Sequence, residues 1–206
     1  MGLLAFFCIA AAAALMGMQV LRWTGLEPAR PWPTALAGTG LGMVLVGYAI
    51  LLYGLSSHLT VLPVAITLGV MAGVGVLSWR MIPACCRSAA SFVRKVWHQG
   101  LGQKAVLVFL VFWLLLSLVG AVIPPGSADY DGLSQHLAQA WTYAHEKSVF
   151  PLWFDHHSQF PATMQMLFTG GMLVDGYVTA RLLNWLTGLM CLVWVVLIAN
   201  RFLKTD

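Results

Sequence analysis

The stretch Ala105–Ile123, AVLVFLVFWLLLSLVGAVI, decides the fold class of this 206-residue chain. It contains no charged residue and is about as long as the ~20 residues that an α-helix needs to cross a bilayer. Three further uncharged apolar stretches are Leu3–Leu21, Ala35–Leu55 and Leu59–Trp79, and a fifth extends over Tyr177–Ala199. The sequence therefore predicts an all-α, polytopic transmembrane helix bundle of about five spans, with an external loop of juxtamembrane helices.

The composition supports a membrane protein and excludes two other classes. Hydrophobic residues make up 60% of the chain and charged residues 9%, and the mean hydropathy is +0.82. Soluble domains carry about 25% charged residues, and disordered chains are poorer in apolar residues than this one. The four cysteines do not form the pattern of a disulfide framework, because two lie in apolar stretches and the other two, Cys85 and Cys86, are adjacent. We expect membrane lipid as a partner and no nucleic acid.

A shorter apolar stretch, Ala162–Val174, is predicted not to cross the membrane. Its thirteen residues would extend only ~20 Å as an α-helix, whereas the hydrocarbon core is ~30 Å thick. We interpret it as a buried or re-entrant helix at the membrane surface.

The distribution of charges predicts the orientation. The segment Arg80–Lys104 carries five cations and no acid, which is typical of a cytoplasmic loop. The segment Pro124–Pro161 carries four acids and a single cation, Lys147, and is predicted to be external. If the short helix does not cross, Arg201 and Lys204 become cytoplasmic, in agreement with the same rule. We therefore expect the N-terminus outside and the C-terminus in the cytoplasm.

These spans divide the chain into two predicted parts. Residues 1–104 hold three N-terminal transmembrane helices and a cytoplasmic segment, in which residues 84–98 have the pattern of an amphipathic helix on the anionic inner leaflet. Residues 105–206 hold the remaining elements, namely a transmembrane helix, the external loop 124–161, the short helix 162–174 and a transmembrane helix over 177–199.

Two pairs of glycines, Gly38/Gly42 and Gly69/Gly73, have the small-xxx-small spacing that lets helices approach closely in membranes. Because the chain contains 20 glycines, chance accounts for much of this spacing. The pairs therefore indicate permitted contacts rather than required ones.

The polar chemistry of the chain is concentrated between Asp129 and His157. This segment holds four of the seven acids and four of the six histidines, namely His136, His145, His156 and His157. Apolar residues at helical spacing predict a helix over Gly132–Glu146, with Asp131 in the N-cap position. Asp131 is therefore either a helix cap or a functional acid. His136 falls on the apolar face, where it is either a packed, hydrogen-bonded histidine or a site residue.

Two chemistries fit this cluster of residues. One is a metal site built from Asp129, Asp131 and the histidines, since carboxylate and imidazole are ordinary ligands of Zn²⁺ or Mn²⁺. The chain has no His-x₃-His or Cys-x₂-Cys pair, so the ligand spacing is nonspecific. The other is general-base catalysis by a carboxylate on a hydroxyl acceptor at the water–lipid boundary.

The segment resembles bacterial membrane glycosyltransferases of the GT-C superfamily, in particular the branch related to dolichyl-phosphate-mannose protein mannosyltransferases. The resemblance covers roughly Val106–Arg201. It is carried by Pro124, Pro125, Tyr130, Asp131, Leu133, His136, Leu137, Ser158, Gln159, Phe160, Pro161 and Ala180–Leu183. Members usually have around a dozen transmembrane helices, so the chain is similar to the N-terminal portion only. The missing C-terminal half, or a partner membrane subunit, is then an expected partner.

The resemblance implies a hexosyl- or pentosyltransferase of the cell envelope, in the bacterial inner membrane, that uses a polyprenyl-phosphate-linked sugar. Asp131 would be the general base, and Asp129 would position the acceptor or a divalent cation. The substrate-binding residues would be Tyr130, His136, Lys147, His156, His157 and Gln159. Two alternatives remain open, namely a non-enzymatic membrane subunit whose external loop docks a partner and a metal-handling membrane protein.

Overall fold

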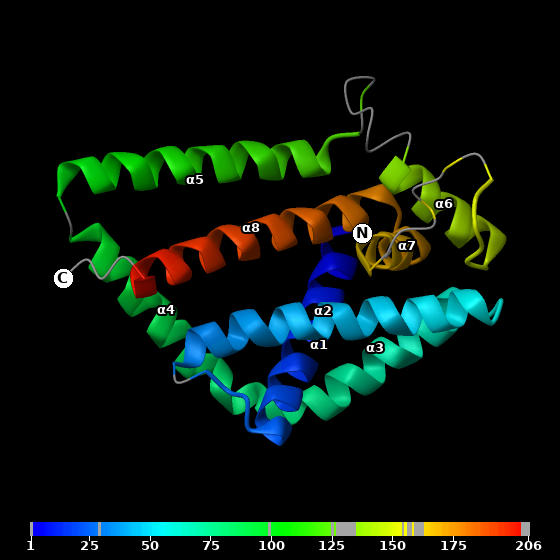
Figure 1. The fold of residues 1–206 in the computed structure, drawn as a ribbon, viewed down its shortest axis with the longest axis horizontal. Coiled ribbons are helices and arrows are strands. Elements are labelled where there is room, and N and C mark those ends of the chain that lie inside the picture. Colours follow the sequence, from blue (N-terminus) through cyan, green and yellow to red (C-terminus); the bar gives the residue numbers. More distant parts are fainter. Residues whose placement is uncertain are drawn as a thin grey trace.

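The structure, a computed structural model, describes residues 2–28, 30–98, 100–124, 126, 135–153, 155, 158 and 163–202, with the backbone alone at Val96, Asn200 and Arg201. These residues form helices joined by short connections and contain no strand (Figure 1). The helices are α1 (Gly2–Thr24), α2 (Pro31–Leu55), α3 (Val61–Gly75), the 3₁₀ helix η1 (Val76–Met81), α4 (Ile82–Trp97), α5 (Leu101–Val122), α6 (Leu137–Glu146), α7 (Thr163–Val174) and α8 (Tyr177–Phe202).

Five helical stretches are long and apolar enough to cross a membrane, which confirms the predicted fold class and a membrane location. They are α1, α2, the continuous stretch Val61–Lys95, α5 and residues Tyr177–Ala199 of α8. Each predicted span coincides with one of them. Their core is formed by apolar side chains of α1, α2, α7 and α8, such as Ile9, Ile50, Leu167 and Leu183.

One end of the bundle, which we call the α6–α7 end, gathers four segments that are distant in sequence. The Thr179 hydroxyl donates to the carbonyl of Gly2 at 3.1 Å, and the Val149 amide donates to the carbonyl of Gly54 at 2.9 Å. Arg181 donates to the carbonyl of Ile123 at 2.9 Å. The starts of α1 and α8, the α2–α3 turn and the end of α5 therefore lie together, as the predicted alternation of spans requires.

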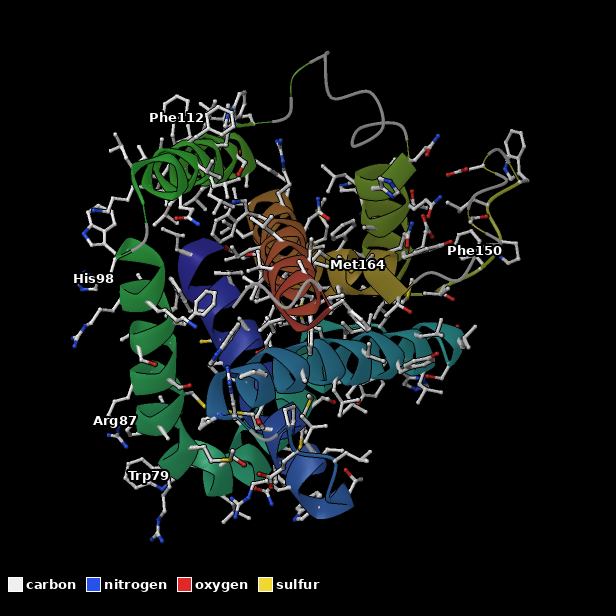
Figure 2. All side chains as sticks on the ribbon, turned by 60° about the vertical axis from the view of Figure 1, so that its left-hand side comes forward. Trp79, Arg87, His98, Phe112, Phe150 and Met164 are labelled. Carbon is white, nitrogen blue, oxygen red and sulfur yellow. The ribbon has the colours of Figure 1, made fainter. Side chains whose placement is uncertain are left out.

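The opposite end, the η1–α4 end, is defined by another set of contacts. Arg22, near the end of α1, donates to the carbonyl of Leu77 at 3.3 Å. The rings of Trp32 and Phe92 pack with their centroids 5.1 Å apart. Figure 2 shows Arg87 at this end, on the opposite side of the molecule from Phe150.

The short helix α7 lies wholly at the α6–α7 end. After Val174 the chain reverses in a turn in which the amides of Asp175 and Gly176 both donate to the carbonyl of Gly171, at 3.0 and 3.1 Å. Gly176 has φ +97°, a backbone conformation that glycine adopts without a steric penalty. The turn leads directly into α8, so the chain begins its last span beside the end of α5. Helix α7 is shorter than the helices that are long enough to cross a membrane, and that it does not cross stays a prediction.

Helices α1 and α2 cross with their backbones in contact. A methyl group added at Gly42 would overlap the backbone carbonyl of Ala13, and one at Gly17 would overlap the carbonyl of Gly38. By contrast, a methyl group at Gly69 or Gly73 would meet no atom within 4 Å. Only the first of the two glycine pairs in the sequence is therefore a site of close helix approach.

The predicted amphipathic helix is α4, and it packs against the start of α2. The side chain of Cys85 is buried, and its thiol contacts the carbonyl of Pro31 at 3.1 Å. Phe92 is half-buried on the same side, but Ala89 and Val93, which the sequence places on the apolar face, are exposed. The face that contacts the protein is thus narrower than the pattern suggested.

Helix α5 presents most of its apolar surface outward and is attached to the bundle through α8, which runs beside it in Figure 1. The indole nitrogen of Trp185 donates to the Ser117 hydroxyl at 3.0 Å and approaches the carbonyl of Leu114 at 3.3 Å. In a bilayer, the outward face of such a helix contacts lipid.

Candidate functional site

The candidate site is the layer that α6, α7 and the start of α8 form at the α6–α7 end. Leu137 and Ala140 of α6 pack with Phe168 of α7 and Ala180 of α8 in a small apolar core. The helix predicted over 132–146 is described from Gln135 onward, and α6 itself comprises Leu137–Glu146. The predicted N-cap, Asp131, lies outside the described residues.

His136 and Gln165 join the beginnings of α6 and α7. The Nδ1 atom of His136 lies 3.2 Å from the amide nitrogen of Gln165, and the imidazole packs edge-on against the ring of Phe168. His136 is hydrogen-bonded, as one interpretation of the sequence predicted. Its side chain is exposed, however, and is not packed in a core. An exposed imidazole with one ring nitrogen engaged keeps the other for a ligand.

A buried polar cluster fastens the segment after α6 to the inner face of that helix. Gln139, 1% exposed, donates from its amide nitrogen to the Asp155 carboxylate at 2.5 Å. The Tyr143 hydroxyl, one helical turn further along, shares a hydrogen bond with the Ser158 side chain. The Ser158 oxygen also accepts the amide of Leu152 at 2.9 Å. These bonds hold Leu152, Asp155 and Ser158 against α6.

The same cluster perturbs the phenol of Tyr143. Burial raises the pKa of Tyr143 above its ordinary value, and the negative charge of Asp155 raises the pKa further. The hydrogen bond to Ser158 offsets part of this effect. The carbonyl oxygen of the Gln139 side chain is buried and has no hydrogen-bond partner among the described residues. Unsatisfied buried acceptors are rare, so this oxygen faces a position where a donor would be favourable.

Lys147 lies at the other end of α6 from His136. Its backbone is left-handed, with φ 55°, and its carbonyl accepts the amide of Leu59 at 3.2 Å. The two residues are eleven positions apart, which corresponds to about 16 Å along a helix axis. A single phosphate group cannot contact both, so the two predicted ligand-binding residues serve different parts of any bound substrate.

Aromatic side chains cover the outer surface of this layer. Trp141 and His145 stack with ring centroids 5.0 Å apart, and Trp141 is largely exposed. Trp153 is 95% exposed and Phe150 is also exposed. Exposed aromatic rings at the end of a transmembrane bundle are typical of the headgroup region.

Several of the predicted site residues lie outside the described residues. They are Asp129, Tyr130, Asp131, His156, His157 and Gln159. Where the structure describes the chain, no three His, Cys, Asp or Glu side chains lie close enough to hold a metal ion. The predicted cation ligands Asp129 and Asp131 lie outside the described residues, so the divalent cation stays a prediction.

Three residues of this layer had no role in the predicted site, namely Gln165, Gln139 and Arg181, although Arg181 lies in the stretch Ala180–Leu183 that carries the resemblance. Gln139 and Tyr143 are polar residues four apart on a helix face that is otherwise apolar, and this signal could have identified them. Arg181 was visible as a cation at the start of an apolar span, and its bond to Ile123 gives the reason. Gln165 carries no such signal in the sequence.

Comparisons with models of protein families, with curated proteins and with solved structures find no match to this chain.

Proposed function

We propose that the protein is a membrane glycosyltransferase, or the N-terminal part of one, that transfers a hexose or pentose from a polyprenyl-phosphate donor to an acceptor hydroxyl. The proposal places the reaction at the α6–α7 end, which faces the outside of the inner membrane. It rests on the resemblance of residues 106–201 to GT-C enzymes and on one structural observation.

That observation is that α6 and α7 form a layer over one end of the bundle, between the end of α5 and the start of α8. The bond from Arg181 to Ile123 closes this arrangement, and a tight turn joins α7 to α8. A transmembrane helix, juxtamembrane helices and a returning transmembrane helix are the order that the resemblance implies. The segment carrying Asp129 and Asp131 connects α5 to α6 in sequence.

In the proposed reaction the Asp131 carboxylate accepts the proton of the acceptor hydroxyl. The acceptor oxygen then attacks the anomeric carbon, and the bond from this carbon to the phosphate oxygen breaks. Polyprenyl phosphate leaves with the electron pair. Asp129 positions the acceptor or a divalent cation, while Tyr130, His136, His156, His157 and Gln159 contact the substrates. Lys147, at the far end of α6, attracts negative charge along the entry path.

The test uses the chain in membranes, with short-chain polyprenyl-phosphate hexoses and pentoses that carry a photoreactive group. Illumination should crosslink the probe between residues 124 and 161, and excess unlabelled polyprenyl phosphate should prevent the crosslink. Where transfer is measured, Asp131→Asn should lower the rate about 10²-fold or more while leaving the crosslink intact. Asn caps a helix about as well as Asp, so the variant separates catalysis from capping.

Glu146→Gln is the matched control, because it removes one exposed carboxylate from the other end of α6 and should leave transfer unchanged. Wild-type transfer by Asp131→Asn would show that Asp131 is only a cap. Crosslinks confined to residues 80–104 would place the donor on the opposite side and overturn the proposal.

A further inference from the structure

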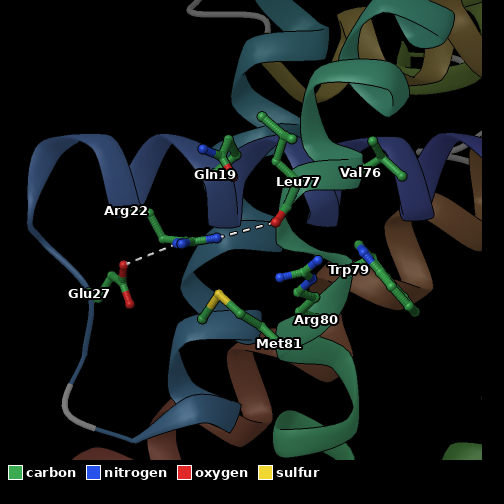
Figure 3. Close-up of a pocket in the computed structure, with 8 residues that line it drawn as sticks. All are labelled: Gln19, Arg22, Glu27, Val76, Leu77, Trp79, Arg80 and Met81. Carbon is green, nitrogen blue, oxygen red and sulfur yellow. Dashed lines mark hydrogen bonds and ion pairs between the residues drawn. The ribbon is translucent and has the colours of Figure 1, made fainter.

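A cavity lies at the η1–α4 end, far from the candidate site. Its volume is about 820 Å³, within the range of small-molecule sites. Figure 3 shows that the end of α1 and η1 form its walls, with the side chains of Arg22 and Arg80 reaching into the same space. Two guanidinium groups therefore face one cavity at the end of a transmembrane bundle.

The 3₁₀ geometry of η1 produces one wall of this cavity. With three residues per turn, side chains three positions apart lie one above the other. Leu77 is therefore aligned with Arg80, and Val76 with Trp79, all lining the cavity. Leu77 and Trp79 are 60% and 57% exposed, so apolar surface continues outward from the two cations.

A buried hydrogen bond joins the two helical segments that form the walls of the cavity. The Ser78 hydroxyl donates to the side-chain carbonyl of Gln19 at 2.7 Å, and the two residues are 0% and 4% exposed. This bond joins α1 to η1 about one helical turn before Arg22. The bond therefore holds together the two helical segments that carry the cations.

The charge of the cavity is incompletely balanced. Glu27 lies 3.7 Å from Arg22, but both side chains are about two-fifths exposed, and such pairs stabilise a protein weakly. Among the described arginines other than Arg181, only Arg22 forms an ion pair with a carboxylate. Two guanidinium groups against one carboxylate leave a net charge of +1 in the cavity.

We propose that this cavity binds the phosphate group of an anionic phospholipid. Arg22 and Arg80 would donate charge-assisted hydrogen bonds to the phosphate oxygens, because guanidinium groups match the geometry of phosphate. The acyl chains would follow the exposed apolar surface of Leu77 and Trp79. A phosphate carrying one net negative charge matches the charge of the cavity, whereas a zwitterionic headgroup does not.

Native mass spectrometry of the purified chain in detergent tests the proposal. The probes are phosphatidylglycerol, phosphatidylcholine with the same acyl chains, and inorganic phosphate. We expect one tightly bound phosphatidylglycerol, at least about tenfold weaker binding of phosphatidylcholine, and no displacement by millimolar phosphate. Binding of phosphatidylcholine with equal affinity, or displacement by inorganic phosphate, would overturn the proposal.

Two pairs of substitutions locate the site. Arg22→Gln with Arg80→Gln should weaken phosphatidylglycerol binding about tenfold or more. Arg87→Gln with Arg94→Gln removes the same charge from exposed positions of α4 and should weaken binding by less than twofold. Equal losses in the two double variants would show diffuse attraction to a basic surface and would contradict a built site.

A variant that is expected to bind phosphatidylglycerol more tightly controls for misfolding of the arginine variants. Glu27→Gln removes the carboxylate that competes with phosphate for Arg22 and should tighten phosphatidylglycerol binding severalfold. A damaged fold cannot produce this gain. Unchanged or weaker binding by Glu27→Gln would contradict the assignment of Arg22 to the lipid phosphate.

Discussion

The crossing of α1 and α2 yields a quantitative prediction, because the two backbones touch at glycines. A methyl group at Gly42 would overlap the backbone carbonyl of Ala13, and neither group is the end of a flexible side chain that could rotate away. The helices must separate by roughly 1.5 Å to restore a normal carbon–oxygen contact. A gap of 0.5–1 Å already forfeits a quarter to a half of the dispersion energy at each contact.

The separation opens the interface that buries Ile9 and Ala12 of α1 against Met43 and Val46 of α2. Overpacking of this kind costs about 1–3 kcal/mol and occasionally more. We expect Gly42→Ala to lie at the upper end, about 3 kcal/mol. For a chain of this size, 3 kcal/mol lowers the unfolding temperature by about 6–12 °C.

The assay is thermal unfolding in detergent, followed by intrinsic tryptophan fluorescence. Gly69→Ala is the matched control, because its methyl group meets nothing within 4 Å and alanine is favoured over glycine in a helix by up to ~1 kcal/mol. It should leave the unfolding temperature unchanged or raise it. Unfolding of Gly42→Ala within 2 °C of wild type, or an equal decrease for Gly69→Ala, would refute the backbone contact.

Two further predictions concern the α6–α7 end. In a chain whose own cysteines are replaced, single cysteines at positions 127 and 176 should react with a membrane-impermeant maleimide from the same side of the membrane. The reason is that Arg181 joins the end of α5 to the start of α8. Labelling from opposite sides would mean that α7 crosses. The raised pKa of Tyr143 predicts that the folded chain loses stability as the pH rises past about 10, because the unfolded chain then releases its phenolic proton before the folded chain does. Tyr143→Phe has no phenolic proton to release, so the difference in unfolding temperature between wild type and variant should shrink between pH 8 and pH 11. A difference that stays constant over this range would contradict the raised pKa of Tyr143.

The spans were predictable from the sequence because apolar length is a direct requirement of the bilayer. Each predicted span lies within three or four residues of a helical boundary, except that the third ends in η1 and continues into α4. That Thr163–Val174 is shorter than the candidate spans was also predictable from the sequence. The length and boundaries of an apolar helix depend on the residues of that helix alone, so a single sequence is enough to predict them.

Contacts between helices were less predictable. The pairs Gly38/Gly42 and Gly69/Gly73 have the same spacing, yet only the first meets another helix. Similarly, nothing near Gln165 in the sequence indicates a bond to His136, because the bond joins two helices across 29 positions of the chain. Such contacts depend on how helices pack in three dimensions, which periodicity within one helix does not determine.

The burial of Asp155 changes how the charge of residues 124–161 should be interpreted. In the sequence, residues 124–161 carry four acids against one lysine, a composition that would repel a polyprenyl phosphate. In the structure, Asp155 is 7% exposed and bound to Gln139, so its charge is directed inward. The exposed side chains of α6 and its C-terminal end include His136, His145 and Lys147 against Glu146 alone. This surface therefore does not repel the anionic donor that we propose, and the proposed general base, Asp131, lies in the sequence between α5 and α6.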